Sequence, residues 1–178
     1  EAIKKAETQF NKEYPLIIGK EKIFNQEKLL SYNPSKKDEV VGICQKATAE
    51  QANQAIEVAF ETFKMWKNVP AKKRAEYLFK AANLIKKRRY EFNSWLILET
   101  GKNYAEADAD VAEAIDFLNF YATEVLRYAE KQPVVKYPGE NNELVYIPLG
   151  VGVVIPPWNF PLAILVGMTS AAFGSGNT

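Results

Sequence analysis

Apolar residues at helical spacing fill the middle of the chain. The first such stretch covers residues 48–66 and opens on Thr48, which is followed three positions later by Gln51, the pattern of a capping box. A second stretch runs from Pro70, a residue favoured at the first helical position, to about residue 101. A third runs over 106–130 with one apolar stripe. The pattern predicts three successive helices.

Shorter patterns precede these helices. Residues 2–12 indicate a short polar helix. The runs YPLIIGKEKI and KLLSYNP alternate apolar residues with Gly and Pro, which predicts short strands joined by a tight turn. VVGICQK (residues 40–46) is a further β-rich run. The N-terminal part is therefore expected to hold a small sheet.

The pattern of apolar and polar residues changes again over residues 132–150. Two short β-rich runs flank a Gly-Glu-Asn-Asn turn, and prolines at 133, 138 and 148 are typical of an edge or a protruding hairpin. An unpaired strand edge invites a partner strand. We expect a projecting hairpin that serves homo-oligomerisation.

A strand and a buried helix are predicted to follow. VGVVI (151–155) is continuous and β-branched, like a strand covered on both faces. Residues 161–173 are apolar almost all round and begin with Pro161 at the expected first helical position. Strand, tight turn and helix form the opening of a βαβ unit, so the fold class is α/β. Ligands in such folds bind beyond the carboxyl ends of strands, where PPWNFP (156–161) lies.

Composition narrows the function classes. The net charge of +1 gives no reason to expect nucleic acid or an anionic membrane, and the basic run 86–89 is expected to be a solvated helix face. No apolar run reaches the ~18 residues of a membrane span, and no secretory leader opens the chain. Cys44 is the only cysteine and no histidine can activate it, so we expect a non-catalytic, packed strand residue and a cytoplasmic protein. The abrupt ends suggest a fragment.

Asn159 has two interpretations. Its side chain could cap the helix that begins at Pro161, which is a common role for asparagine. Alternatively, its amide could donate a hydrogen bond to an oxygen that gains negative charge during a reaction. A neutral donor suits that task because it does not neutralise a nucleophile nearby.

Three carboxylates share one face of the third predicted helix. Glu106, Asp110 and Glu113 are spaced i, i+4 and i+7. A metal site is one interpretation, but neither a calcium-loop glycine nor an imidazole accompanies them. Carboxylates near the start of a helix are also favoured by its dipole. We therefore expect a solvated face and no metal.

The chain resembles the NAD(P)-dependent aldehyde dehydrogenase family. The resemblance rests on PWNFP after a hydrophobic strand, on GNT near residue 178, and on the order of YPLIIGKEKI, NPSKKDEVVG, three helices, hairpin and strand. Within the family, GKNYAEADADVAEAIDFLNFYA and YIPLGVGVVIPPWNFPLAI are most similar to the 1-pyrroline-5-carboxylate (glutamate semialdehyde) dehydrogenases. The resemblance covers essentially the whole chain.

The resemblance implies an activity and a domain plan. The activity would be NAD-dependent oxidation of L-glutamate γ-semialdehyde to glutamate in proline catabolism, through a cysteine thiohemiacetal. Residues 1–131 would be strands and helices of a Rossmann-like cofactor-binding domain, 132–150 the oligomerisation hairpin, and 151–178 the first βα unit of the core. The nucleophilic cysteine and the general-base glutamate would lie beyond these residues. A sister semialdehyde dehydrogenase and a non-catalytic assembly module are the alternatives.

The resemblance also assigns residues. Asn159 would stabilise the oxyanion, Phe160 would pack against the aliphatic part of the substrate, and Glu113 would face the aldehyde pocket. The residues expected to line the cofactor are Ile155, Pro156, Pro157 and Trp158. Pro156 departs from the small or hydroxylated residue common in the family, and its backbone cannot donate a hydrogen bond.

Overall fold

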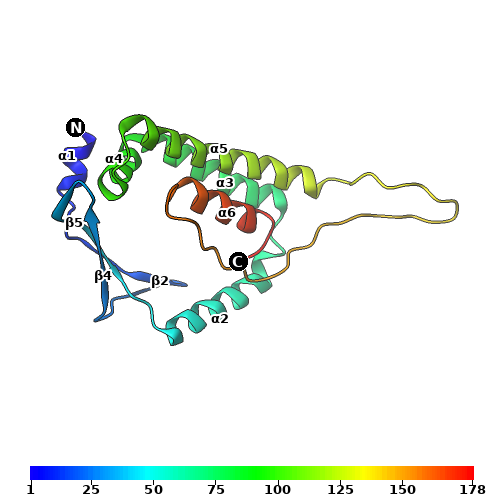
Figure 1. Ribbon diagram of the computed structural model, residues 1–178. Helices are drawn as coiled ribbons and strands as arrows, with labels where there is room; N and C mark the ends of the chain where they lie inside the picture. Colours follow the sequence, from blue (N-terminus) through cyan, green and yellow to red (C-terminus); the bar gives the residue numbers. More distant parts are fainter.

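The strands lie in the N-terminal part of the chain, where one short helix precedes them and the longer helices follow. The computed structural model describes residues 1–178. Its strands are β1 (Glu13–Tyr14), β2 (Leu16–Ile18), β3 (Glu21–Ile23), β4 (Lys28–Asn33) and β5 (Lys36–Gln45). Its helices are α1 (Ala2–Glu7), α2 (Ala49–Trp66), α3 (Ala71–Lys87), α4 (Arg89–Thr100), α5 (Tyr104–Ala129) and α6 (Ala163–Gly174). A long ribbon projects from the body between α5 and α6 (Figure 1).

Two small sheets form from the β-rich runs. β4 and β1 flank β5, with β4 antiparallel and β1 parallel to it, while β2 and β3 make a separate antiparallel pair. The predicted strands and their turn are confirmed. Cys44 lies on β5 as expected, but its side chain is exposed and the prediction that it packs is wrong. The polar helix at the start is shorter than predicted, since α1 ends at Glu7.

The predicted helices are present, with one division. The capping box of α2 forms, because Thr48 Oγ1 accepts from the Gln51 backbone N–H and the Gln51 side chain accepts from the Thr48 N–H. The prediction of a single helix from Pro70 to about residue 101 is wrong. This stretch divides into α3 and α4 at Arg88, whose φ of −104° and ψ of 17° leave the helical region. Pro70 precedes α3 as its N-cap residue instead of occupying the first helical position.

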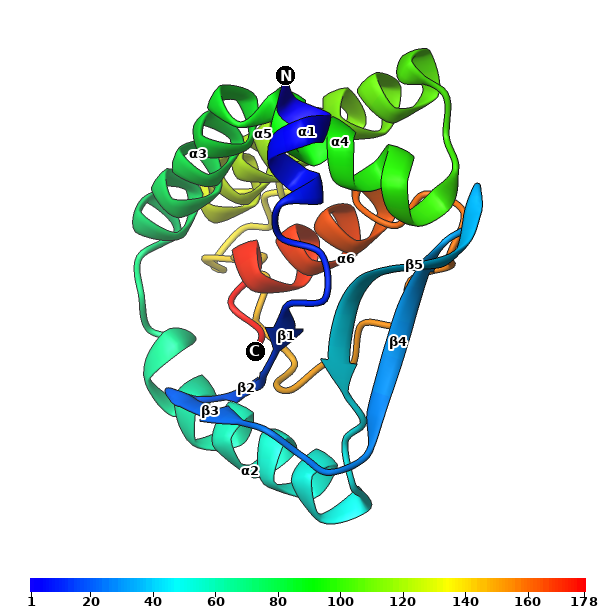
Figure 2. The ribbon, with the colours of Figure 1, turned by 90° about the vertical axis from the view of Figure 1, so that its left-hand side faces the viewer.

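The main core lies between α3 and α5. Its buried side chains are Ala75, Leu78, Ala82, Leu118 and Ala122. Small side chains on facing stripes let the two helices approach closely. α6 packs under this pair, on the side that faces α2 (Figures 1 and 2). The contact with α5 is close at Gly167, where an added Cβ would lie 2.9 Å from Cδ2 of Phe117.

The C-terminal end of α6 is held by side chains from α2 and α3. Trp66 Nε1 donates to the Phe173 carbonyl at 3.1 Å, and the two rings lie 4.2 Å apart between centroids. Arg74 Nε donates to the Gly174 carbonyl at 2.8 Å, and burial lowers the pKa of its guanidinium. These bonds satisfy carbonyls that a helix end leaves free. They fix α6 relative to the preceding helices.

The predicted hairpin at 132–150 is present only as a projecting ribbon. No paired strands form, and the tight turn lies at Pro138–Gly139, ahead of the predicted position. Its one internal backbone bond runs from the Glu140 N–H to the Tyr137 carbonyl at 3.1 Å. The predicted strand pairing is therefore not observed. Pro133 and Pro148 each remove a ladder donor from one arm, which weakens pairing between the arms.

The predicted strand at 151–155 also forms no regular strand. Val153 and Ile155 are 71% and 79% exposed, so the expected burial on both faces is wrong for this chain. The Thr178 N–H donates to the Gly150 carbonyl at 3.1 Å, and the Gly152 N–H donates to the Thr178 carbonyl at 2.8 Å. These two bonds have the arrangement of one rung of a parallel ladder around Val151. The segment thus has a parallel neighbour at one point, reached after α6.

Candidate active site

The loop PPWNFP lies between the 151–155 segment and the start of α6. Trp158 is 87% exposed and Asn159 is also exposed. α6 begins at Ala163, two residues later than predicted, with Leu162 as its N-cap residue and no side-chain cap from its own loop. Asn159 therefore does not cap this helix, and that interpretation is wrong.

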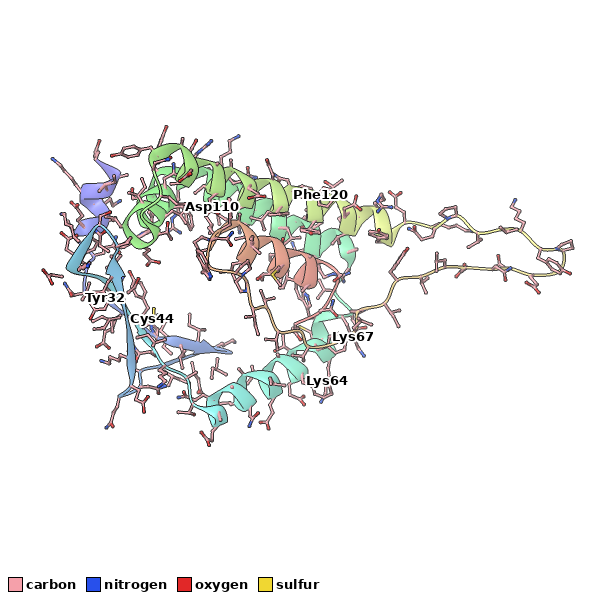
Figure 3. All side chains as sticks on the ribbon, in the orientation of Figure 1. Tyr32, Cys44, Lys64, Lys67, Asp110 and Phe120 are labelled. Carbon is pink, nitrogen blue, oxygen red and sulfur yellow. The ribbon has the colours of Figure 1, made fainter.

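The cap of α6 comes from another helix. The Ala163 backbone N–H donates to Oδ1 of Asp110, on α5, at 2.7 Å. The Asp110 side chain is completely buried, and Figure 3 shows it where α5 faces the start of α6. A carboxylate is favourable there because the first N–H groups of a helix lack partners and carry partial positive charge.

Lys102 completes this arrangement. Its Nζ donates to Oδ2 of Asp110 at 2.8 Å, and only 12% of its side chain is exposed. The same ammonium lies 4.1 Å from the centroid of the Phe160 ring, within the range of a cation–π contact. Lys102 follows Gly101, which ends α4 with a φ of 72°, a conformation that favours glycine.

The prediction of a solvated acidic face is wrong at Asp110. Both of its oxygens are occupied, one by Lys102 and one by the Ala163 N–H. Glu113 is exposed, as expected. It lies on α5 between Asp110 and Phe117, and both of these residues contact α6. Glu113 is therefore on the side of α5 that faces the loop and α6.

A second ion pair fixes the start of α5 against α4. Arg89 binds Asp108 through two parallel bonds, each 2.5 Å long, and Asn93 Nδ2 donates to the same carboxylate at 2.9 Å. The bonds from Arg89 and then from Asn93 lower the pKa of Asp108. Asp108 is two residues from Asp110, so the pair helps set the register of the helix that carries the buried carboxylate.

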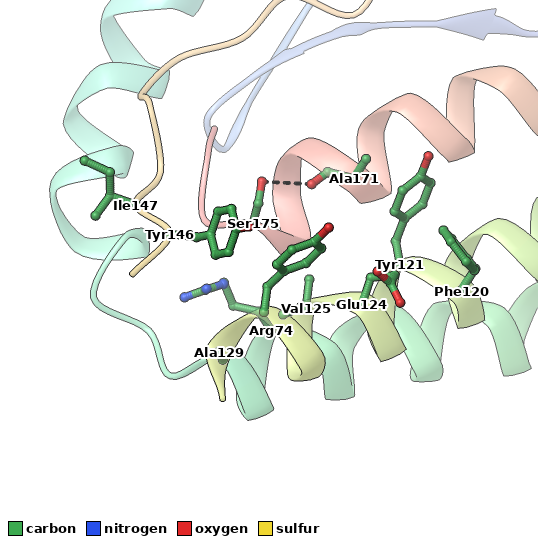
Figure 4. Close-up of a pocket in the computed structure, with 11 residues that line it drawn as sticks. Arg74, Phe120, Tyr121, Glu124, Val125, Ala129, Tyr146, Ile147, Ala171 and Ser175 are labelled. Carbon is green, nitrogen blue, oxygen red and sulfur yellow. Dashed lines mark hydrogen bonds between the residues drawn. The ribbon is translucent and has the colours of Figure 1, made fainter. Parts of the chain in front are cut away.

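An apolar cavity lies elsewhere on the molecule. It has a volume of about 540 Å³ and lies between the C-terminal half of α5, the end of α6 and the root of the ribbon (Figure 4). Tyr128 and Tyr146 meet edge to face in its wall, with ring centroids 4.6 Å apart. None of the site residues predicted from the sequence lines it.

The sequence profile described as "Aldehyde dehydrogenase family" matches residues 23–178. The chain belongs to the aldehyde dehydrogenase family. It is 49% identical over 178 residues to 1-pyrroline-5-carboxylate dehydrogenase from Geobacillus sp. (strain WCH70), covering 100% of this chain and 35% of that protein. The α/β fold class is confirmed by solved structures of this family.

Two solved structures are closely similar to this aldehyde dehydrogenase chain. A mutant of Thermus thermophilus 1-pyrroline-5-carboxylate dehydrogenase superposes with a TM-score of 0.94 at 48% identity, covering 99% of this chain and 34% of that one. The Thermus enzyme described as having bound NAD matches with the same TM-score, identity and coverage. The chain thus spans about a third of the length of these relatives. None of its helices combines the length and apolar character needed to cross a membrane.

The contacts of Lys102 with Phe160 and Asp110 were not predicted from the sequence. The apolar stripe of α5 nevertheless indicates that Asp110 is buried, because Ala107, Val111 and Ala114 on that stripe are fully buried. Asp110 lies three residues after the first and four before the last of these, so it shares their face. A carboxylate on a buried face needs a charged or hydrogen-bonding partner.

Proposed function

We propose that the protein to which this chain belongs oxidises L-glutamate γ-semialdehyde to L-glutamate with NAD. The observation that carries the proposal is the exposed Asn159, on a loop fastened to the body on its C-terminal side by Asp110 and Lys102. The similarity to 1-pyrroline-5-carboxylate dehydrogenases over the whole chain supports the substrate. The NAD-bound relative supports the cofactor.

The proposed role of Asn159 is to stabilise developing negative charge. When a nucleophile attacks the aldehyde carbon, the carbonyl oxygen gains charge, and an amide N–H held in place lowers the energy of that state. Asn159 is free of the capping role that would have occupied its side chain. The family resemblance implies that the nucleophile is a cysteine outside these residues and that its attack gives a thiohemiacetal. Loss of hydride from the former aldehyde carbon would turn the thiohemiacetal into a thioester, which water would hydrolyse.

The proposed cofactor surface is the segment before Asn159. Ile155 and Trp158 are 79% and 87% exposed within these 178 residues, and apolar side chains of this kind can pack against a flat ring or a ribose. Pro156 and Pro157 offer carbonyl acceptors but no N–H donors. These four residues fit a cofactor held by packing and by hydrogen bonds to its hydroxyls. NAD, when bound, accepts the hydride that leaves the aldehyde carbon.

The proposed substrate surface combines Phe160 with Glu113. Phe160 is partly exposed, and one face of its ring is covered by the Lys102 ammonium. The open part of the ring can pack against the methylene groups of the semialdehyde. Glu113 is a free carboxylate on the neighbouring face of α5. It suits an amino-acid substrate because the α-ammonium of that substrate is positively charged.

Replacing Glu113 by alanine in the full-length protein is expected to lower kcat/KM for the semialdehyde by about tenfold, mainly through KM. That is the loss expected from removing one hydrogen bond to a charged group. Steady-state rates of NADH formation measure it, and thermal unfolding should be unchanged because Glu113 is exposed. Asp116→Ala, an exposed acid one turn further along α5, is the matched control. Identical kinetics for the two variants would make Glu113 an ordinary surface residue.

Substrate choice tests the proposal as a whole. The full-length protein is supplied with NAD and either 1-pyrroline-5-carboxylate, which equilibrates with the open semialdehyde, or a panel of plain aldehydes. We expect the highest kcat/KM with 1-pyrroline-5-carboxylate. If the protein prefers a different semialdehyde, it is a sister semialdehyde dehydrogenase. If no aldehyde yields NADH, the proposed aldehyde oxidation is refuted.

Homo-oligomerisation through the ribbon is part of the proposal. The large apolar side chains on its two arms that are more than half exposed are Val135, Tyr137, Val145, Tyr146, Ile147 and Leu149. Arms without internal pairing keep their backbone groups free for another subunit. These features support an assembly contact at 132–150.

A further inference from the structure

We propose that Lys102 and Asp110 are a positioning pair that sets the place of the Asn159 amide. The inference rests on the proposed role of Asn159 and deepens it. Neither residue needs to touch the aldehyde or the cofactor. Their effect on the reaction would pass through the loop that carries the amide.

The bonds of the pair bracket the turn next to Asn159. On one side, the Lys102 ammonium lies 4.1 Å from the ring centroid of Phe160, the residue directly after Asn159. On the other side, Asp110 accepts from the Ala163 N–H at 2.7 Å. The 2.8 Å bond between Lys102 and Asp110 joins these two contacts. One ion pair therefore holds both ends of the stretch 160–163.

The pair is itself held rigidly. Asp110 is fully buried and Lys102 is 12% exposed, so water competes little for their bonds. Asp110 is part of the long helix α5, whose start is fastened to α4 through the Arg89–Asp108 pair. Lys102 follows Gly101, where an added Cβ would lie 3.1 Å from Cγ of Pro34. The side chains thus project from fixed backbone on both sides.

Positioning matters here because an oxyanion donor works only over a short range of distance and angle. A displacement of about 1 Å at a reacting centre can cost on the order of a hundredfold in rate. Binding of NAD depends on a broader surface and should be less sensitive. Loss of the pair should therefore appear in kcat, with little change in the KM for NAD.

The test compares variants of the full-length protein. Lys102→Met keeps the aliphatic length but removes the charge, and kcat is expected to fall by about tenfold to a hundredfold. Lys102→Arg should recover most of the rate, because a guanidinium can pair with Asp110 and stack on Phe160. Lys87→Met, on the exposed end of α3, is the matched control and should behave as the parent. A kcat for Lys102→Met within twofold of the parent would overturn the proposal.

A double-mutant cycle separates positioning from a general structural role. In the Asn159→Ala background, Lys102→Met should lower kcat no further, because the amide that it positions is gone. A second fall of the same size would show an independent effect and overturn the proposal. Asp110→Asn, which keeps an acceptor for the Ala163 N–H, provides the same cycle if Lys102→Met does not fold.

The cycle also distinguishes the two proposals. If Asn159→Ala leaves kcat unchanged, the oxyanion role fails and the positioning pair fails with it. If Asn159→Ala lowers kcat strongly while Lys102→Met does not, only the positioning pair fails.

Discussion

Replacing Asn159 by alanine in the full-length protein is expected to lower kcat by about 10²–10³-fold. The loss corresponds to one hydrogen-bond donor that acts on the oxygen of the attacked aldehyde. Affinity for NAD should change little, since the cofactor is proposed to contact Ile155–Trp158 and not the amide. Steady-state kinetics for both substrates, together with NAD binding by fluorescence titration, measure the two effects separately.

The control for this variant is Asn83→Ala, an exposed asparagine on α3 far along the chain from the loop. It should retain the parental rate and affinity. Asn159→Asp is a second comparison, because it preserves shape but replaces the donor with a negative charge that repels the oxyanion. It should be at least as slow as Asn159→Ala. A fall in NAD affinity equal to the fall in kcat would show that Asn159 serves cofactor binding.

Elements whose signals are local could be predicted from the sequence. The capping box of α2 needs only Thr48 and Gln51, which lie within one turn, and it forms as expected. The stripes of α3 and α5 are likewise periodic in sequence and become the main core. The division at Arg88 could not be predicted, because neither glycine nor proline marks it and the residues around it favour helix.

Elements that depend on distant partners could not be predicted in the same way. The hydrophobic run 151–155 has the composition of a central strand, yet a strand exists only where neighbours satisfy its N–H and C=O groups. Here one neighbour contact is present, at Thr178. The ribbon at 132–150 follows the same rule, since each of its arms has free backbone groups and contains a proline that opposes their mutual pairing.

The candidate site shows the same division between local and distant signals. The loop and its amide are visible as a motif, and Asn159, the nearest polar residue, is one candidate for the cap on α6. The structure uses Asp110, which is 53 residues away from Ala163 in the sequence. Sequence-local rules favour the closer residue because most helix caps are local. Only packing of α5 against α6 brings the carboxylate to the helix end.

Replacing Asp110 by alanine is expected to destabilise the full-length protein by about 3–5 kcal/mol, the usual cost of removing one partner from a buried ion pair. The variant leaves the Lys102 ammonium with little water and no carboxylate, and it leaves the first N–H of α6 without an acceptor. Urea unfolding followed by tryptophan fluorescence measures the change, and Trp66 reports directly on α6 because it contacts Phe173.

Two comparison variants identify the cause of that loss. Asp116→Ala removes an exposed carboxylate from the same helix and should leave the unfolding midpoint nearly unchanged. The double variant Asp110→Ala with Lys102→Met removes both charges, so it should be more stable than Asp110→Ala alone. That order follows because the single variant buries an unpaired charge, whereas the double variant buries none. If Asp110→Ala unfolds at the same urea concentration as Asp116→Ala, the buried carboxylate does not hold α6 in place.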